Sequence, residues 1–246
     1  MNTTTPGTYV LVHGTWHTGA ELEAAASHLR AVGHTVHCPT LAGNRPGDDR
    51  ACTGLEDAAQ SLKTYIEEHN LNQVRLVGHS DGGMVISRVA DLLPQRIARL
   101  VYVNAFVPQP GERLNDLVPP HYVALFNSIA TQTGGGVMLP FPVWREALIN
   151  DADLALATRA FEQLNVHPYK TFQDQIVLSQ PMAAMAVPKS YVNCRMDTAL
   201  PHSLGWHPRL SERLGLFRYA ECSGNHEVWF TDPEAIAAAI ERAGRD

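Results

Sequence analysis

The fold is decided by the stretch Val74-Arg-Leu-Val-Gly-His-Ser-Asp-Gly-Gly-Met-Val-Ile86. Its first four residues are mostly apolar and predict a short buried strand, and a helical pattern of apolar residues begins at Met84. Between the two, Gly78-His-Ser-Asp-Gly82 matches G-x-S-x-G, a sharp strand-to-helix turn that exposes its serine. The two glycines lack the Cβ atoms that would clash in so tight a turn. The sequence therefore predicts that Ser80 is a nucleophile at the C-terminal end of a strand.

A nucleotide-binding loop with an incidental serine is the alternative interpretation of this turn. Such loops carry a lysine at Walker A spacing or a G-x-G-x-x-G run, and neither is present here. The backbone N–H groups that follow Ser80 are expected at a helix N-terminus, where they attract negative charge. We therefore favour a nucleophile over a phosphate-binding loop.

Composition and charge restrict the location and the partners. The net charge of −6 argues against nucleic acid and anionic membranes as partners. No apolar run approaches the ~18–20 residues that span a bilayer, and the first six residues do not resemble a signal peptide. The four cysteines are widely spaced and form no C-x-x-C pair, which indicates free thiols. We therefore expect a cytoplasmic protein whose partner is a small molecule and not nucleic acid or a membrane, and a homodimer is left open.

Strands and helices alternate along much of the chain. Apolar runs predict strands at residues 9–12, 35–38, 74–77, 99–103, 188–193 and 216–220. Helices are predicted at 21–31, after a capping box at 53–56, after Ser80, at 153–164 and at 232–243. The alternation predicts a parallel sheet with helices on both faces.

The alternation is interrupted between residues 106 and 186, where Pro, Gly and short helical patches replace it. Of those patches, only 153–164 predicts a convincing helix. We therefore expect a core formed by residues 1–105 and 187–246 and an inserted, mainly helical cap formed by residues 106–186.

The partners of Ser80 follow from the chemistry of a serine nucleophile. Its hydroxyl needs a base that accepts the proton, and the base needs an acid that orients it. In a fold with this turn, the chain order is serine, acid, histidine, each at the C-terminal end of a strand. Asp197 follows the penultimate predicted strand and His226 follows the last. The alternatives are that Asp197 only caps its own turn and that His226 is an ordinary loop histidine.

Other polar residues receive smaller roles. We interpret His79 as structural packing, and His202 and His207 either line the cleft or are solvated. Asn104 ends a predicted strand where some related proteins have a carboxylate, but an amide cannot act as the acid. No histidine spacing indicates a metal site, and no cofactor is expected.

An oxyanion hole requires two N–H donors that are already in position. The backbone N–H of Asp81, the residue after the nucleophile, is one candidate. The N–H of Thr15, in the loop after the first strand, is the other, and Gly14 lets that loop approach closely.

With these residues in place, the chain resembles the α/β-hydrolase superfamily, and within it the branch of plant methylesterases, hydroxynitrile lyases and pyrethroid-hydrolase-like esterases. The resemblance covers nearly the whole chain. It is carried by residues 11–14 with His17, 33–34, 39–41, 78–83, 101–108, 197–201, 224–226 and 232–234. It implies a mostly parallel eight-stranded sheet, a helical cap and ester hydrolysis through an acyl-serine, without a cofactor.

Two positions distinguish this chain within the branch. The lyases are similar but have Thr in place of Gly14 and Lys directly after the catalytic histidine, where this chain has Glu227. A carboxylate there would oppose a departing anion, which disfavours a lyase. The esterases commonly have an apolar residue at that position, so Glu227 either points away from the pocket or disfavours substrates that carry a carboxylate. Dehalogenases and epoxide hydrolases have Asp as the nucleophile, and Ser80 disfavours both.

The sequence thus predicts a serine carboxylesterase that acts on a small to medium, largely apolar ester. The residues expected to contact substrate are Gly14, Trp16, His17, Phe106 and Trp144. Further aromatic residues of the cap that could line the pocket are Tyr122, Phe126, Phe141 and Phe161. The alternatives are a lactonase or natural-product tailoring hydrolase, a cofactor-free oxygenase, and a ligand-binding protein with weak turnover.

Overall fold

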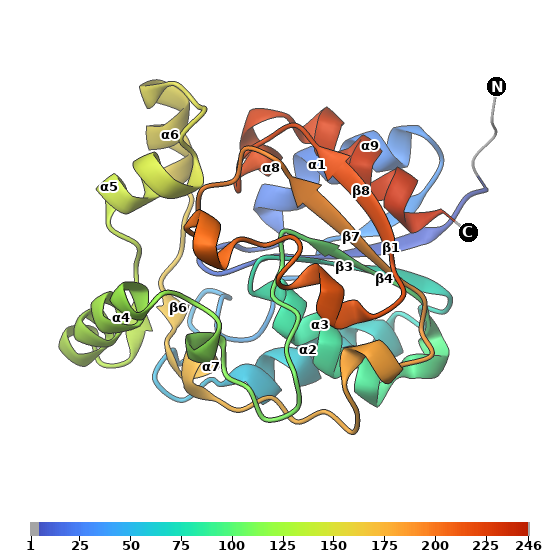
Figure 1. Ribbon diagram of the computed structural model, residues 1–246, viewed down its shortest axis with the longest axis horizontal. Coiled ribbons are helices and arrows are strands. Elements are labelled where there is room, and N and C mark those ends of the chain that lie inside the picture. The colour runs from blue at the N-terminus through green and yellow to red at the C-terminus, as the bar shows by residue number, and fades with distance from the viewer. Residues whose placement is uncertain (1–4, 246) are drawn as a thin grey trace.

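The computed structural model describes residues 5–245 and has one parallel sheet at its centre. The strand order is β2–β1–β3–β4–β7–β8 (Figure 1). The strands are β1 (Thr8–Val12), β2 (Thr35–His37), β3 (Val74–His79), β4 (Ile97–Val103), β7 (Lys189–Cys194) and β8 (Arg218–Cys222). Each of the six predicted apolar runs therefore forms or overlaps one strand.

The number of strands in the main sheet differs from the eight that were expected. Within residues 5–245 the main sheet has six strands, and all of their pairings are parallel. The other two strands, β5 (Gly136–Val137) and β6 (His167–Pro168), are two residues long and pair with each other in antiparallel register. Within residues 5–245 only these six segments pair into the main sheet, and the two edge strands, β2 and β8, are partly exposed.

Helices cover both faces of the sheet because side chains alternate along each strand. On β1, Tyr9 and Leu11 pack on one face, against α1 (Glu23–Ala31) and α9 (Pro233–Gly244). Val10 and Val12 pack on the other face, with α2 (Leu55–Glu68) and α3 (Gly82–Leu92). Figure 1 shows these two pairs of helices above and below the strands. The predicted two-sided packing is confirmed.

Local signals at the helix starts are partly confirmed. Asp232 begins α9 by accepting a hydrogen bond from Ala235 N–H at 2.9 Å. The capping box expected at residues 53–56 is displaced by one residue, because the N–H of Gly54 donates to the Asp57 carboxylate at 2.8 Å. Thr53 lies one residue before the N-cap, Gly54, and its hydroxyl donates to the backbone oxygen of Asp49.

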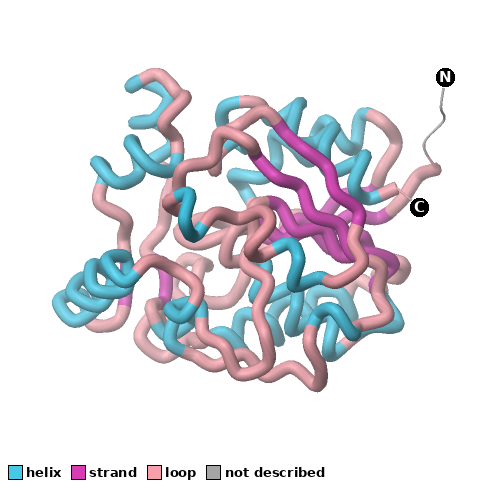
Figure 2. The backbone as a smooth tube through the Cα atoms, in the orientation of Figure 1, coloured by secondary structure: helices cyan, strands magenta, loops and turns pink. Residues whose placement is uncertain are grey.

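The segment between β4 and β7 is built from helices and long loops (Figure 2). Its helices are α4 (Pro120–Thr133), α5 (Phe141–Val143), α6 (Leu154–Phe161) and α7 (Lys170–Gln173). The longest of them, α4, has 14 residues, so the expectation that only residues 153–164 form a convincing helix here was wrong. Helix α6 begins as expected at Asp153, whose carboxylate accepts from Leu156 N–H, and it ends at 161 rather than 164. The chain also has α8 (Val228–Thr231) and short 3-10 or π-helical turns at Ala20–Leu22, Pro94–Arg96, Leu114–Asp116, Trp144–Leu148, Met182–Ala184, His202–Leu204 and Ser211–Leu214. The cap limits of 106 and 186 stay a prediction.

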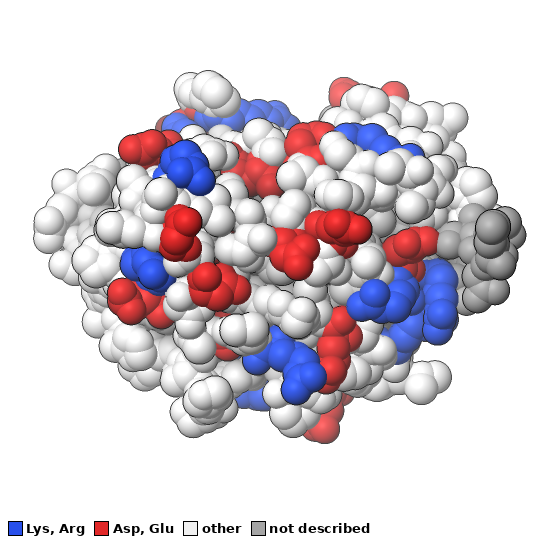
Figure 3. Space-filling view, turned by 90° about the horizontal axis from the view of Figure 1, so that it is seen from above, with Lys and Arg blue, Asp and Glu red and all other residues white. Residues whose placement is uncertain are grey.

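Two surface properties bear on the expected partners. No helix within residues 5–245 has the length and apolar character that a membrane crossing requires. On the face seen in Figure 3, acidic and basic side chains are interspersed.

The strand order places a crevice beside the predicted nucleophile. The order reverses at β1, which lies between β2 and β3. In open α/β sheets, ligands bind at the carboxyl ends of the strands where the order reverses. Val12 is paired with Gly78 near those ends, so the loops after β1 and β3 meet there.

The N-terminus of α3 provides a test of this packing. A Cβ at Gly83 would lie 2.2 Å from the backbone oxygen of Phe106. We expect Gly83→Ala to lower the free energy of unfolding by about 1–3 kcal/mol, because neither backbone can move freely. Urea unfolding measures the change. Gly205→Ala is the matched control, since its Cβ would meet its nearest atom at an ordinary 3.4 Å. Equal stability of the two variants would contradict the packing.

Candidate active site

Ser80 lies in the sharp turn between β3 and α3. Its φ of 53° is in the left-handed region, which is strained for a residue other than glycine. Two backbone hydrogen bonds hold it: its N–H donates to Val103 at 3.3 Å, and its carbonyl accepts from Phe106 N–H at 3.0 Å. A Cβ at Gly78 would lie 2.8 Å from the Gly82 oxygen, so the turn requires glycine there. The end of β4 therefore fixes the Ser80 backbone.

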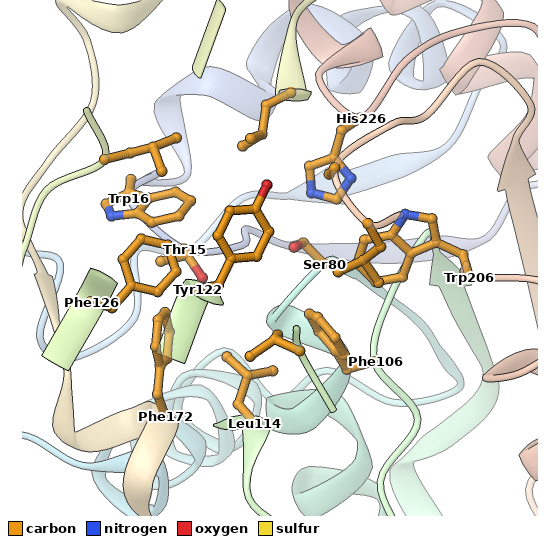
Figure 4. A pocket seen from close by; sticks show the side chains of 15 residues that line it. Thr15, Trp16, Ser80, Phe106, Leu114, Tyr122, Phe126, Phe172, Trp206 and His226 are labelled. Atoms are coloured by element: carbon orange, nitrogen blue, oxygen red, sulfur yellow. The ribbon is translucent and has the colours of Figure 1, made fainter. Parts of the chain in front are cut away.

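Asp197 and His226 are brought together by the loops after β7 and β8. His226 Nδ1 lies 2.6 Å from Asp197 Oδ2, and their side chains are 4% and 1% exposed. The carboxylate accepts from Nδ1–H, which leaves His226 Nε2 available to accept a proton. Figure 4 shows Ser80 and His226 next to each other in the wall of one cavity.

Two opposing effects act on the His226 imidazole. Burial lowers its pKa, whereas the Asp197 carboxylate, and more weakly that of Glu227, raise it. The net effect is a pKa above the ordinary value. The site therefore favours the imidazolium that forms when His226 takes a proton.

Asp197 is itself held by hydrogen bonds. The Asn104 side-chain amide donates to Oδ2 at 2.5 Å, and Ala199 N–H donates to Oδ1 at 2.8 Å. The turn-capping interpretation and the acid interpretation are thus compatible, because Oδ1 accepts from the N–H of its own turn while Oδ2 accepts from His226. Asn104 sits at φ 35° with its side-chain oxygen accepting from Cys194 N–H. Its role as a donor to Asp197 was missed; its position at the end of the strand beside β7 was the available signal.

The His226 ring is packed between two other rings. His79 lies 4.6 Å from it, and Trp206 stacks on it at 5.2 Å with an interplanar angle of 14°. His79 Nε2–H also donates to the His226 backbone oxygen at 3.0 Å, and burial lowers the pKa of His79 well below its usual value. A neutral His79 therefore supports the base. Trp206 was missed; its place nine residues after Asp197, in the same loop, was the signal.

Two backbone N–H groups border the Ser80 turn. Those of Thr15 and Asp81 have no hydrogen-bond partner among residues 5–245, and both residues are buried. Gly14 brings the first loop close, since a Cβ there would lie 2.9 Å from Ser80 Cβ. Unpaired buried donors beside a nucleophile suit an oxyanion.

The cavity in front of Ser80 has a volume of about 500 Å³. Its lining is largely apolar, with Trp16, Phe126 and Phe172 on one side and Phe106 and Trp206 on the other (Figure 4). The full lining is Thr15, Trp16, Ser80, Phe106, Leu114, Val118, Tyr122, Phe126, Leu139, Leu148, Phe172, Ala199, Leu200, Trp206 and His226. None of these described residues is Asp, Glu, Lys or Arg.

Three of the five residues expected to contact substrate lie outside this lining. Gly14 packs behind the Ser80 turn, and His17 is turned away from the cavity. Trp144 is completely buried and donates from Nε1 to the Ala157 oxygen at 2.9 Å, so it packs within the cap. Trp16 and Phe106 do line the cavity.

The other aromatic and histidine candidates divide in the same way. Tyr122 and Phe126 line the cavity, whereas Phe141 and Phe161 pack against each other with ring centres 5.1 Å apart. His202 and His207 lie outside the lining. Phe172, from the very short α7, was missed, because a four-residue helix has no recognisable period.

Glu227 points away from the cavity toward His17. The two side chains are 1% and 3% exposed, with 3.2 Å between Glu227 Oε2 and His17 Nε2. Burial lowers the pKa of His17, but Glu227, and then Glu21, raise it, and the net pKa lies above the ordinary value. Of the two alternatives for Glu227, the structure thus shows the orientation away from the pocket.

No group of three or more His, Cys, Asp or Glu side chains able to hold a metal occurs in the described part of the chain.

Comparisons with known proteins agree with this geometry. A model described as the alpha/beta hydrolase family matches residues 9–239. The carbendazim hydrolyzing esterase of Nocardioides sp. is 38% identical over 146 residues, which cover 54% of this chain and 60% of that protein. The chain thus matches less than two thirds of that esterase. The pyrethroid hydrolase of Sphingobium wenxiniae is 25% identical over 249 residues, covering 94% and 85%.

A solved structure matches over nearly its whole length. It is described as an extracellular alpha/beta-hydrolase from a Paenibacillus species that shares structural and functional homology with tobacco Salicylic Acid Binding Protein 2. The TM-score is 0.94 and the identity 35%, with 98% of this chain and 100% of that chain covered. The resemblance found in the sequence is confirmed.

The Asp197–His226 pair generates a prediction for NMR titration. We expect Asp197→Asn to lower the pKa of His226, because the anion that favours the imidazolium is removed while the effect of burial stays. The ring-carbon shifts of His226 against pH measure it. Glu221→Gln removes an exposed carboxylate from β8 and serves as the control. An unchanged His226 pKa in Asp197→Asn would contradict the pairing.

Proposed function

Because this chain belongs to the alpha/beta hydrolase family, we propose that it is a serine carboxylesterase that works through an acyl-serine intermediate. The observation that carries the proposal is the buried 2.6 Å hydrogen bond between Asp197 and His226 beside Ser80. The names of matched relatives, an esterase and a pyrethroid hydrolase, support ester hydrolysis.

Acylation begins at Ser80. Its Oγ attacks the ester carbonyl carbon while His226 Nε2 accepts the hydroxyl proton. Asp197 keeps the proton on Nδ1 and stabilises the imidazolium. The N–H groups of Thr15 and Asp81 donate to the carbonyl oxygen as it becomes an anion. Collapse of the tetrahedral intermediate breaks the ester bond, and His226 gives its proton to the leaving alkoxide, which departs as an alcohol.

Deacylation repeats these steps with water. His226 removes a proton from the water, whose oxygen attacks the acyl carbon. The second tetrahedral intermediate is held by the same two N–H groups. Its collapse releases the carboxylic acid and returns the proton to Ser80 Oγ, so no cofactor is consumed.

The substrate class is inferred from the cavity. The space in front of Ser80, including the part open to solvent, is about 500 Å³, which limits the substrate to a small or medium molecule. Its aliphatic and aromatic walls favour an apolar acyl or alcohol group, and the absence of Asp, Glu, Lys and Arg from the described lining favours a neutral ester. We propose a small to medium, largely apolar carboxylic ester, and a lactone reacts by the same chemistry.

A ligand-binding protein with weak turnover is the second candidate. It is favoured by one observation, the described homology of the Paenibacillus structure to a salicylic acid-binding protein.

We also propose that the protein is located in the cytoplasm, because its four cysteines are free. Cell fractionation tests this against the extracellular location of the Paenibacillus relative.

The first test of the function compares wild type with Ser80→Ala on p-nitrophenyl esters of several acyl lengths. We expect Ser80→Ala to abolish turnover beyond the background rate, because the oxygen that forms the acyl intermediate is removed. Ser27→Ala, an exposed serine on α1, is the control and should keep full activity. Full activity of Ser80→Ala would exclude the acyl-serine mechanism. A wild type inactive on all esters and lactones would favour the ligand-binding candidate.

The cavity walls generate a second prediction for the same assay. Phe126→Ala enlarges the cavity, so the preferred acyl chain should become longer. Phe141→Ala removes an equal side chain from the same region of the chain but outside the lining, and its acyl preference should match wild type. The ratio of kcat/KM for long and short esters is the measurement. Equal profiles for both variants would show that the acyl group binds elsewhere.

A further inference from the structure

A buried contact between a histidine and a carboxylate joins the loop after β1 to the residue that follows His226. His17 lies in the loop after β1, and Glu227 directly follows His226. The pair is almost completely buried, with 3.2 Å between its nitrogen and oxygen. Breaking such a pair inside a protein is costly, because the remaining charge has no partner. The two loops are therefore held together at this point.

The hydrogen bonds of His17 determine where its protons are. Nδ1 lies 2.7 Å from the backbone oxygen of Thr15, which can only accept, so Nδ1 carries a hydrogen. Nε2 then faces Glu227. A neutral ring would direct the Nε2 lone pair at a carboxylate oxygen. A second hydrogen on Nε2, giving an imidazolium, removes that repulsion and makes the contact attractive.

His17 contacts both peptides that meet at Thr15: its backbone N–H bonds the Gly14–Thr15 peptide, and its ring bonds the following Thr15–Trp16 peptide. The Thr15 N–H belongs to the Gly14–Thr15 peptide, whose oxygen accepts from His13 Nδ1–H at 2.9 Å and from His17 N–H at 3.4 Å. The Thr15 oxygen accepts from the His17 ring. Both carbonyls that flank Thr15 are thus held, and its N–H is the group left unpaired. Orienting this N–H is what an oxyanion hole requires.

We propose that Glu227 and His17 form a positioning pair for the oxyanion hole: Glu227 holds the His17 ring, and the ring holds the Thr15 N–H toward Ser80. This inference rests on the proposed function, since it assigns the pair a role in that reaction. It also explains why a carboxylate follows the base in this chain. Glu227 acts through His17 and Thr15 and does not touch substrate.

The surroundings of His17 leave Glu227 as the main charge that acts on it. Glu21 also contributes, but its carboxylate already accepts from the N–H and the hydroxyl of Thr18. His79 is 6.3 Å away between ring centres and is neutral, because burial lowers its pKa. Two more histidines act on His17 electrostatically: His13, whose pKa burial lowers to about 3, and His226. Trp144 and Phe230 add uncharged rings. Loss of Glu227 should therefore lower the pKa of His17 and favour its neutral form.

The test compares Glu227→Met with Glu227→Gln. Met leaves His17 Nε2 without a polar partner, and we expect kcat to fall about 10–100-fold with little change in KM, because a displaced oxyanion donor weakens the transition state more than the substrate complex. Affinity for a trifluoromethyl ketone, which forms a tetrahedral adduct with Ser80, should fall with kcat. The glutamine side chain can donate an N–H to neutral Nε2 and should restore most of kcat.

The pH profile separates this role from a merely structural one. In wild type, kcat should fall at alkaline pH as His17 loses its Nε2 proton and faces the carboxylate unprotonated. Glu227→Gln should lack this alkaline decrease, because the introduced amide can donate a hydrogen bond to neutral His17. Loss of the Glu227 charge lowers the pKa of His226, whereas loss of the positive charge on His17 raises it. Because the effect of Glu227 is the larger of the two, the acidic limb should move to lower pH in both variants.

Matched controls come from a second histidine–carboxylate contact, His34 with Glu241 at 3.9 Å, neither of which lines the cavity. Glu241→Met and Glu241→Gln should keep wild-type kcat. The proposal is overturned if Glu227→Met behaves like Glu241→Met, or if the alkaline decrease persists unchanged in Glu227→Gln. NMR titration of His17 gives a readout without turnover and should show a lowered pKa in Glu227→Gln. Ser80→Ala tests the proposed function separately, because it removes turnover and leaves the His17 titration intact.

Discussion

The strained backbone of Ser80 is the constraint on which the rest of the structure depends. A residue other than glycine keeps a backbone φ of 53° only where surrounding contacts hold it. Here Val103, at the end of β4, and Phe106, in the loop after it, supply them, and glycines at 78 and 82 allow the backbones to meet without a clash. The parallel sheet places β4 beside β3, so the sheet order and the exposure of Ser80 have one origin.

Buried histidine–carboxylate pairs connect the loops around this turn. Asp197 with His226 joins the loops after β7 and β8, and Glu227 with His17 joins the last of these to the loop after β1. Each pair lies in surroundings that disfavour charge, and in each the carboxylate keeps the pKa of the histidine above its ordinary value. Of two adjacent residues, His226 thus places its own imidazole beside Ser80, and Glu227 contacts the imidazole of His17 in the loop after β1.

The sequence predicted those features that depend on local patterns. Six apolar runs identified the six main strands, and G-x-S-x-G identified the turn because that motif is a local backbone requirement. Asp197 and His226 were found from chain order alone, since parallel strands bring their carboxyl ends to one edge. The eight-strand count failed because it came from resemblance and not from a pattern in this chain.

Only the tertiary structure decided what lies beside what. Trp206, Asn104 and Phe172 take their places through contacts between segments distant in the sequence, and no local pattern records such contacts. His17 and Trp144 were expected in the cavity and are turned into the protein by partners that the sequence could not reveal. The sequence by itself determined the six main strands, the sharp turn at Ser80 and the order of Ser80, Asp197 and His226 along the chain, because these follow from local patterns and chain order. The packing of the cap and the direction of each buried side chain followed from the fold, because they depend on which surfaces meet.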